Sequence, residues 1–377
     1  MKKLLSVLVL LVAALVFTAC GKTEEEKTVN FGMLGPFTGA LSQYGEPARK
    51  GVALAVEEIN KAGGVLGKQV VLHAEDDEGD AAKALNAYNK LVDSIDFLIG
   101  EITSGTSEVI AVEAQKDGLP MLSPSATAFG VTLNRSYVFR VCFLDPDQGV
   151  SMANFAAESL KIKKVAVAYD NGDDYSKGVA AAFKAQAEAK GLTVVFYDGG
   201  VVPDSSDYKA LATKIKNSEA EAVFIPIYAG SVATLTKDVR AAGYTLPLLG
   251  ADGWDGAQAI LAGEDGKGDV TPLNNCYFSS GFDASADNAK TFVAAYKAKY
   301  GEEPNTFAAL GYDAAYLAKA AFEKAGTTDK AAVAAALAAV TYSGVTGDFT
   351  YNATGNPVKK ILICEFINGK VTFKESK

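Results

Sequence analysis

The sequence predicts an α/β fold with two doubly wound, parallel-sheet lobes. Short apolar segments alternate with amphipathic helical segments through most of the chain, a pattern typical of parallel sheets covered by helices on both faces. The alternation occurs twice along the chain. The two copies share a detail, because Tyr44 and Tyr175, which lie 131 residues apart, precede corresponding helices. The length of 377 residues also fits two domains better than one.

The first copy of the pattern begins with an apolar strand at 29–34. The segment 48–62 places Val52, Val56 and Ile59 on one face of a helix, which a Gly-Gly pair ends. The other expected elements of this copy are strands at 69–74, 97–100 and 119–123 and a helix at 80–93.

The second copy repeats this order between residues 164 and 250. Its expected strands are 164–169, 192–197, 222–228 and 246–250, and its expected helices are 177–190, 207–217 and 232–242. From about Asn275 the pattern changes. The remaining expected elements are helices at 286–300, 307–324 and 329–339, a strand near Phe349 and a strand at 361–368.

Residues 1–19 have the features of a cleavable secretory leader. Two lysines precede a mainly apolar segment, 4–19, which is shorter than the ~20 residues that a membrane-spanning helix needs. Cys20 follows small residues at the boundary, and this arrangement resembles the lipobox of bacterial lipoproteins, in which the cysteine carries a diacylglycerol. The resemblance implies an exported protein with a lipid anchor at Cys20 and a charged tether at 20–28.

Charge and composition exclude several classes of function. Two of the 36 basic residues lie in the leader, which leaves 34 against 45 acidic residues and a net charge of −11. Such a surface repels nucleic-acid phosphates. A single histidine, His73, gives little basis for metal or triad chemistry, so neither an enzyme nor a cofactor or metal is expected.

The cysteines beyond the leader show no metal-site spacing. Cys142, Cys276 and Cys364 are expected to be buried free thiols that pack as small apolar groups. A disulfide between two of them is the alternative in an exported protein.

Ligands of open α/β sheets bind at the carboxyl ends of the strands. In the first copy, two strand ends lead into hydroxyl-rich loops, one with Ser104 and the other with Ser125 and Thr127. Hydroxyls and free helix N–H groups favour an anion, although N-capping alone would also explain each loop. The matching loop of the second copy presents Asp252, whose carboxylate suits an ammonium group or forms an Asx-turn. An anion site that faces a carboxylate would match a zwitterionic amino acid.

Aromatic residues also stand at strand ends. Tyr44, Tyr175 and Tyr228 are candidates for the walls of a cleft, with ordinary packing as the alternative.

Two other motifs are weak evidence for phosphate binding and for hydrolysis. The segment 63–68 lacks the spacing of a phosphate-binding loop, and His73 has no G-x-S-x-G elbow with it.

A set of motifs spread over the chain is specific to one family. It comprises Gly35-Pro36-Phe37-Thr38-Gly39, Gln43-Tyr44-Gly45, 57–64, Asp76-Asp77, Pro124-Ser125-Ala126-Thr127, Phe139-Arg140, 145–149 and 311–314. With these motifs the chain resembles, from Val29 to its C-terminus, the substrate-binding lipoproteins of branched-chain amino acid ABC transporters. This is the leucine/isoleucine/valine-binding protein family, which has the type I periplasmic binding fold.

The resemblance implies a monomeric, extracytoplasmic solute-binding protein with no nucleic-acid partner. It would capture an amino acid, branched-chain or otherwise apolar, and deliver it to a permease and its ATPase. Three chain crossovers, near 141–146, 276–282 and 348–355, would form a hinge between the lobes. The lobes implied are residues 29–143 with 279–353, and residues 144–278 with 354–377.

The resemblance also implies roles for individual residues. The loop of Ser104 would bind the α-carboxylate, and the Ser125 carbonyl, the Thr127 hydroxyl and Asp252 would hold the α-ammonium; the family usually has Glu at the position of Asp252. Residues implied to line the side-chain pocket are Tyr44, Tyr175, Tyr228 and Phe307, with Ile102 and Thr103 close to the ligand. The disulfide found near the cleft of some relatives is absent, because 77–79 and 102–103 contain no cysteine.

Two other functions stay open at this point. A clamp of the same fold would serve as a sensing domain for amides or other small solutes. A secreted hydrolase would use His73 with a nearby serine, but the spacing supplies neither a base nor a group to orient it.

Overall fold

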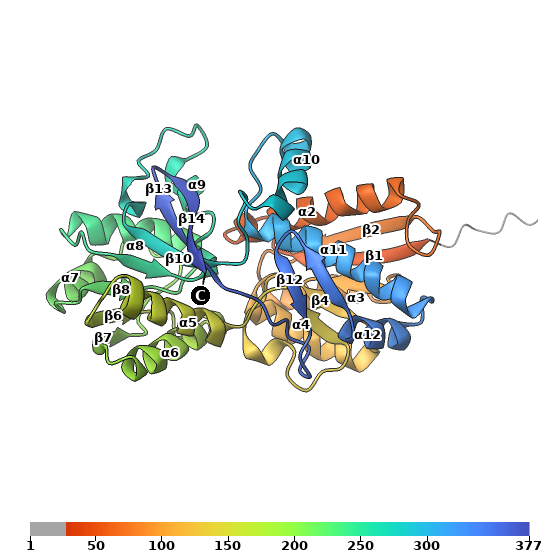
Figure 1. Ribbon diagram of the computed structural model, residues 1–377, viewed down its shortest axis with the longest axis horizontal. Coiled ribbons are helices and arrows are strands. Elements are labelled where there is room, and N and C mark those ends of the chain that lie inside the picture. Colours follow the sequence, from red (N-terminus) through yellow and green to blue (C-terminus); the bar gives the residue numbers. More distant parts are fainter. Residues whose placement is uncertain (1–27, 377) are drawn as a thin grey trace, which may run out of the picture.

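The computed structural model describes residues 28–376 and shows two lobes, each built around its own sheet (Figure 1). The first lobe holds a parallel sheet in the order β2-β1-β3-β4-β5. Its strands are β1 (Val29–Gly35), β2 (Val70–Asp76), β3 (Phe97–Ile99), β4 (Met121–Ser123) and β5 (Val138–Arg140). One face is covered by α3 (Ala81–Leu91) and α4 (Ser104–Asp117), and the other by α2 (Ser42–Lys61) and α11 (Thr306–Ala325).

The second lobe holds a larger sheet in the order β14-β13-β10-β9-β8-β6-β7. Its strands are β6 (Lys164–Ala168), β7 (Thr193–Asp198), β8 (Ala222–Phe224), β9 (Leu248–Gly250), β10 (Cys276–Ser280), β13 (Leu362–Ile367) and β14 (Lys370–Ser376). The helices on its two faces are α5 (Asp145–Asn154) with α6 (Asp174–Ala189), and α7 (Lys209–Asn217) with α8 (Ala229–Ala241).

Shorter elements complete the two lobes. They are α9 (Ala257–Ala262), α10 (Lys290–Tyr300), α12 (Lys330–Ala338), the hairpin β11 (Thr341–Gly344) and β12 (Gly347–Thr350), the π-helix η3 (Phe155–Ser159), and the 3₁₀ turns η2 (Phe129–Val131), η4 (Asp252–Trp254), η5 (Thr271–Leu273) and η6 (Asp287–Ala289). Helices α10 and α12 pack near α2 and α11 of the first lobe.

Burial on both faces explains why the central strands are almost continuously apolar. In β1, Phe31 faces α11, where its ring centroid lies 5.9 Å from that of Phe322. Leu34 on the same strand joins the core beneath α3 and α4. Phe97 and Leu98 of β3 divide between the two faces in the same way, as the alternation of a strand requires.

The two sheets share one plan. The parallel strands of the second lobe follow the order β7-β6-β8-β9-β10, which matches β2-β1-β3-β4-β5 of the first. This equivalence confirms the two doubly wound lobes predicted from the repeat. In sheets of this kind, ligands bind at the carboxyl ends of the strands. The loops that follow the strands of each lobe are therefore the places to look for a binding site.

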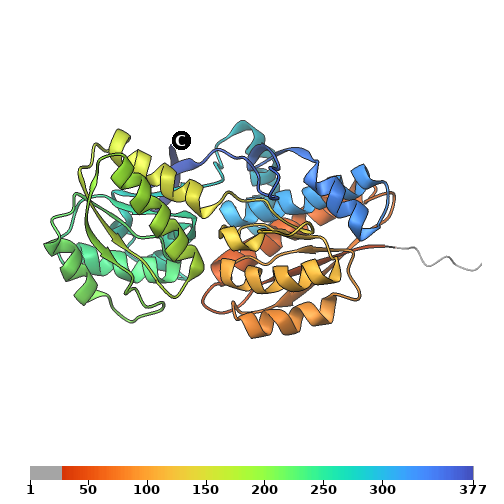
Figure 2. The same cartoon turned by 90° about the horizontal axis from the view of Figure 1, so that it is seen from below.

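The chain passes between the lobes three times (Figure 2). The links lie between β5 and α5, between β10 and α10, and between β12 and β13. Strand β10 belongs to the second sheet as far as Ser280, so the second link begins slightly later than the expected boundary at 278. The third link, 351–361, extends beyond the expected crossover at 348–355.

Several elements differ from the sequence prediction, among them β5, where no strand was expected. Helix α2 begins at Ser42 rather than at 48 and includes Pro47, which removes one backbone hydrogen bond. Burial of Tyr44, Gly45 and Ala48 outweighs this loss, because the first turns pack into the lobe. Strands β13 and β14 form an antiparallel edge on the otherwise parallel second sheet, where only one strand was expected.

Some predictions fall outside the described part of the chain. The leader at 1–19, the lipidation site Cys20 and the tether up to residue 27 are among them. Across residues 28–376, the helices are too short or too polar to cross a membrane. Cys142, Cys276 and Cys364 are buried and free, which agrees with the expectation of packed thiols.

Candidate ligand site between the lobes

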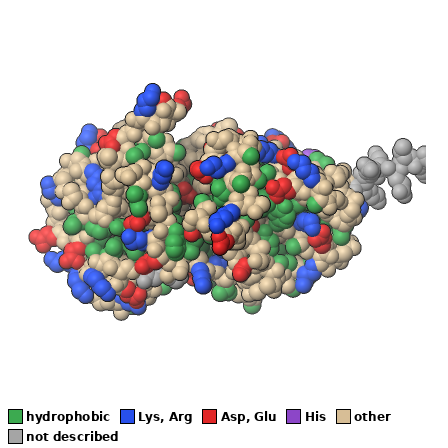
Figure 3. Space-filling model, turned by 45° about the horizontal axis from the view of Figure 1, so that its top comes forward, with side chains coloured by type: hydrophobic (Ala, Val, Ile, Leu, Met, Phe, Trp, Pro, Cys, Tyr) green, Lys and Arg blue, Asp and Glu red, His purple; other side chains and the backbone are tan. Residues whose placement is uncertain are grey.

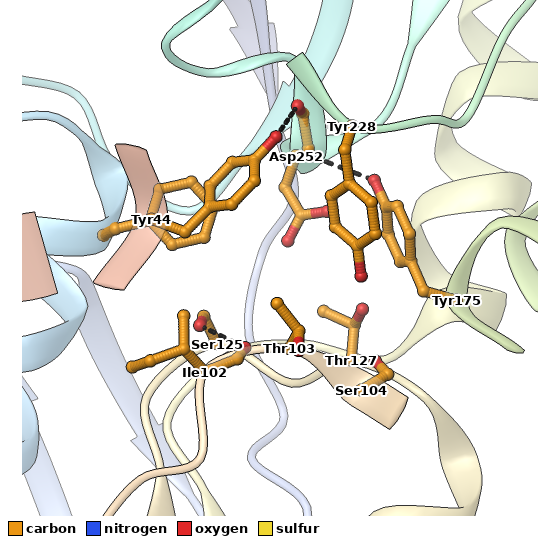
Figure 4. A pocket seen from close by; sticks show the side chains of 11 residues that line it. Tyr44, Ile102, Thr103, Ser104, Ser125, Thr127, Tyr175, Tyr228 and Asp252 are labelled. Carbon is orange, nitrogen blue, oxygen red and sulfur yellow. Dashed lines mark hydrogen bonds between the residues drawn. The ribbon is translucent and has the colours of Figure 1, made fainter. Parts of the chain in front are cut away.

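A small cavity lies where the strand ends of the two lobes face each other (Figure 4). Its lining consists of Tyr44, Ile102, Thr103, Ser104, Ser125, Thr127, Tyr175, Tyr228, Asp252, Gly253 and Phe307. All ten residues singled out in the sequence are therefore brought together, and Gly253 is the one addition. The empty space among them, including the part open to solvent, is about 260 Å³. The surface is indented where the lobes meet (Figure 3).

Helix N-termini place most of this lining. Tyr44, Ser104, Tyr175 and Phe307 lie in the first turns of α2, α4, α6 and α11, and Tyr228 directly precedes α8. The start of a helix has unpaired backbone N–H groups and the positive end of the helix dipole. The cavity is therefore suited to a negatively charged group of a ligand.

Hydroxyl groups of the first lobe line one side of the cavity (Figure 4). The Ser125 hydroxyl donates to the Ile102 carbonyl over 2.7 Å, and Ser104 Oγ accepts from the Ala128 N–H over 3.1 Å. These bonds hold the loops after β3 and β4 to each other. Thr103 is the N-cap residue of α4, yet its side chain makes no capping bond, so capping does not account for it.

Asp252 faces these hydroxyls from the second lobe, between Tyr44 and Tyr228 (Figure 4). It is 4% exposed, and its N–H donates to Gln148 Oε1 over 2.9 Å. Burial raises the pKa of the Asp252 carboxyl to about 6, while the nearby side chains of Tyr175 and Gln148 act in the opposite direction. Because these partners come from α5 and α6, the carboxylate is not confined to a self-contained Asx-turn.

Four aromatic rings form a row along the cavity. Phe307 and Tyr44 have ring centroids 4.7 Å apart, Tyr44 and Tyr228 5.4 Å, and Tyr228 and Tyr175 5.1 Å. The first two belong to the first lobe and the other two to the second. The row thus offers apolar faces to a ligand from both sides of the cleft.

Direct hydrogen bonds join the lobes at this cavity. The Tyr44 hydroxyl donates to the Gly253 carbonyl over 2.7 Å and accepts from the Ala229 N–H over 2.6 Å. Nearby, Asp255 Oδ2 accepts from the Thr306 N–H at the start of α11 over 2.8 Å. These contacts describe a closed arrangement of the two lobes.

Two buried residues behind the cavity received no role from the sequence. Gln148 is fully buried, and its Oε1 accepts from the Asp252 N–H and from the Ser279 hydroxyl. Asp145 donates its N–H to the Thr127 carbonyl, and burial raises the pKa of its carboxyl well above the ordinary value. Both lie in the 145–149 motif, but their partners are far away in the sequence, so spacing gave no signal.

The residue proposed for hydrolysis lies elsewhere. His73 is in β2, where its Nε2 is 3.2 Å from Asn30 Oδ1, and it is not part of the cavity lining. The structure therefore brings no serine of the cavity to this imidazole.

Comparison with known proteins identifies the class that this fold and site define. The model of the periplasmic binding protein family matches residues 28–370, so the chain belongs to that family. Membership implies an extracytoplasmic location, and the family and the relatives below are solute-binding proteins rather than enzymes.

Individual members of the family with similar sequences or structures bind amino acids. Over 338 residues the chain is 35% identical to Leu/Ile/Val-binding protein homolog 3 of Brucella melitensis, covering 87% of this chain and 88% of the relative. It is 32% identical to the leucine-, isoleucine-, valine-, threonine- and alanine-binding protein of Pseudomonas aeruginosa, over 87% of each chain. The crystal structure of LivJ, a branched-chain amino acid transporter substrate-binding protein of Streptococcus pneumoniae in complex with isoleucine, matches with a TM-score of 0.85 and 33% identity, covering 93% of this chain and 99% of LivJ.

Proposed function

We propose that the protein captures a free amino acid with an apolar side chain between its lobes and delivers it to an ABC importer. The observation that carries the proposal is the charge arrangement of the cavity. Helix N-termini and hydroxyls of one lobe oppose the buried carboxyl of Asp252 on the other. A zwitterionic head group complements both sides at once.

The two halves of the head group have distinct partners in this proposal. The α-carboxylate would bind at the start of α4, where Ser104 and the first N–H groups lie. The α-ammonium would contact Asp252, the Thr127 hydroxyl and the Ser125 carbonyl. Charge-assisted hydrogen bonds are worth roughly 1.5–3 kcal/mol each, so three of them with some apolar burial account for the about −8 kcal/mol of micromolar binding.

The side chain of the ligand would lie against the aromatic row. Tyr44, Tyr228 and Phe307, together with Ile102, offer apolar surface and no charge of their own. The ligands named for the relatives are leucine, isoleucine and valine, with threonine and alanine in addition for one of them, and they support an aliphatic amino acid.

Ligand binding would act by favouring the closed form. Ser104 and Thr127 belong to one lobe and Asp252 to the other, so a ligand that contacts all three is held fully only when the lobes close. The permease and ATPase would be the partners that receive the closed, loaded form. A lipid at Cys20 would keep this monomeric protein at the membrane surface, as the lipobox resemblance implies.

A binding screen followed by calorimetry tests the proposal. The thermal shift of the purified protein is measured with each of the twenty amino acids, short amides and urea, and an aliphatic amino acid is expected to give the largest shift. Asp252→Ala should then weaken binding of that ligand at least tenfold, whereas Asp265→Ala, at an exposed loop acid of the same lobe, should not. Unchanged affinity in a folded Asp252→Ala protein would remove the assigned role.

A further inference from the structure

Two acidic side chains lie buried beside each other under the ligand loop of the first lobe. Asp77 follows β2, and Glu101 follows β3, with β1 between these strands in the sheet. Both residues are 0% exposed. The Asp77 N–H donates to the carbonyl of Gly35 at the end of β1, and Asp77 is the charged group that acts most strongly on the Glu101 carboxyl, so the two acids lie close together.

Most oxygens of this pair lack a donor. Gly79 N–H donates to Asp77 Oδ1 over 2.6 Å, but Asp77 Oδ2 and both oxygens of Glu101 have no hydrogen-bond partner. The Thr106 hydroxyl and the Ile102 N–H lie near Glu101 and partly offset the rise of its pKa, but the Thr106 hydroxyl bonds to Thr103. A buried carboxylate without donors is strongly unfavourable, and two in contact are more so.

Asp313 is a buried carboxyl of this protein that does have hydrogen-bond donors. Its two oxygens accept from the Tyr342 hydroxyl, the Val345 N–H, and the N–H and hydroxyl of Thr346. Lys359 adds a positive charge nearby. Within residues 28–376, Asp77 and Glu101 have no such set of donors and no cation beside them.

The charged side chains next to the pair in the sequence have other partners. Asp76 accepts from the N–H groups of Phe37 and Thr38, and Asp80 caps α3. Glu78 forms an ion pair with Lys83. A proton on the pair itself is therefore the remaining way to satisfy it, and it would convert two repelling carboxylates into one O–H···O hydrogen bond.

We propose that Asp77 and Glu101 share one proton, and that the resulting hydrogen bond holds the loop of Ile102, Thr103 and Ser104 in its ligand-binding position. The second part rests on the proposed function. Glu101 directly precedes that loop, and its backbone carbonyl accepts from the Ser123 hydroxyl over 2.5 Å. The acid pair thus links the ends of β2 and β3 to the carboxylate half of the site.

Burial together with the Asp77 charge raises the pKa of the Glu101 carboxyl well above its ordinary value. The folded state therefore keeps a proton that the unfolded chain releases once the pH exceeds about 4.5. Stability from this group is complete below that pH and is lost as the pH rises toward the folded pKa. Glu101→Gln replaces the shared proton by an amide N–H that does not titrate.

Infrared spectroscopy and denaturant unfolding test the shared proton without any ligand. At pH 7.5 the wild-type protein should show a carbonyl band of a protonated carboxyl group that loses intensity in Glu101→Gln. It should keep that intensity in Glu113→Gln, which removes the acid ion-paired with Lys116 on α4. Between pH 5 and 8 the wild-type folding constant should fall by up to tenfold per pH unit relative to Glu101→Gln. An unchanged band and equal pH slopes would overturn the shared proton.

Ligand binding tests the positioning role. Glu101→Gln should bind the amino acid as the wild type does, whereas Glu101→Leu, which fills the space but cannot donate to Asp77, should bind at least fivefold more weakly while still folded at pH 6. If Glu101→Leu binds with wild-type affinity, the pair does not position the loop. If the wild type binds no amino acid at all, the proposed function fails, while the infrared and unfolding results still decide the shared proton.

Discussion

Asp252 combines a buried carboxyl with a site that requires its negative charge. Its pKa of about 6 lies above the ordinary value of 3.8, chiefly because of burial. Affinity for the ligand ammonium should therefore rise with pH as this carboxyl ionises. By calorimetry, the dissociation constant should increase about tenfold per pH unit below pH 6 and be constant above pH 7.

The unliganded protein should show the opposite trend. Because the folded pKa of Asp252 is raised, the folded state holds a proton that the unfolded chain has released between pH 3.8 and about 6. Its contribution to the free energy of unfolding should fall by about 1.4 kcal/mol per pH unit over that window. Asp252→Asn should remove both trends, and an Asp252→Asn protein whose affinity still followed pH would assign the titration to another group.

Gln148 is the residue that fixes the position of Asp252. Its side chain bonds to the Asp252 N–H over 2.9 Å and to the Ser279 hydroxyl over 2.7 Å. Gln148→Leu should weaken amino-acid binding at least tenfold by calorimetry, because the Asp252 loop loses its buried acceptor. Gln186→Leu, which removes a side-chain amide of α6 that bonds Asn154, serves as the control and should bind normally.

At the scale of elements, α2 and α11 pack with their backbones in close approach. A methyl group at Gly311 of α11 would overlap the Ala48 carbonyl, and one at Gly51 of α2 would overlap the Ala308 carbonyl. Gly311→Ala should therefore lower the free energy of unfolding by about 1–3 kcal/mol in urea titrations. Gly230→Ala on α8 would meet only ordinary contacts and should leave stability unchanged or slightly higher, so equal losses in both would argue against close packing.

Elements with a clear apolar period could be predicted, because burial on both faces leaves a mark in the sequence. The strands at 29–34 and 97–100 and the helix at 80–93 are examples, and the site loops follow from their strand ends. Strands β5 and β14 and the start of α2 could not, since each depends on packing against distant segments. The same limit applies to Gln148, whose partners lie 104 and 131 residues away.

Across the whole molecule, Tyr44 is the main contact between the lobes at the cavity. Tyr44→Phe would keep the ring but leave the Gly253 carbonyl and the Ala229 N–H unpaired in the closed form only. Affinity for the amino acid should fall about tenfold, with little change in the melting temperature of the unliganded protein. Tyr300→Phe, which removes a hydroxyl bond to Lys50 within the first lobe, should bind like the wild type.

The pairing of lobes also limits what the sequence could reveal. The repeat predicts two similar sheets, and the loops and strand ends predict seven residues of the cavity. The family resemblance was needed to add Ile102, Thr103 and Phe307. The repeat does not predict that Tyr44 bonds across to Gly253, 209 residues away, or that Asp255 bonds the start of α11. Those contacts arise from how closely the lobes approach, which no local pattern records.

A crystal structure of the protein with the amino acid that gives the largest thermal shift tests the central claim most directly. The account predicts the ligand ammonium about 3 Å from the Asp252 carboxylate and the Thr127 hydroxyl, with its carboxylate at the start of α4 beside Ser104. A ligand bound outside this cavity, or one turned so that its carboxylate faces Asp252, would contradict the account.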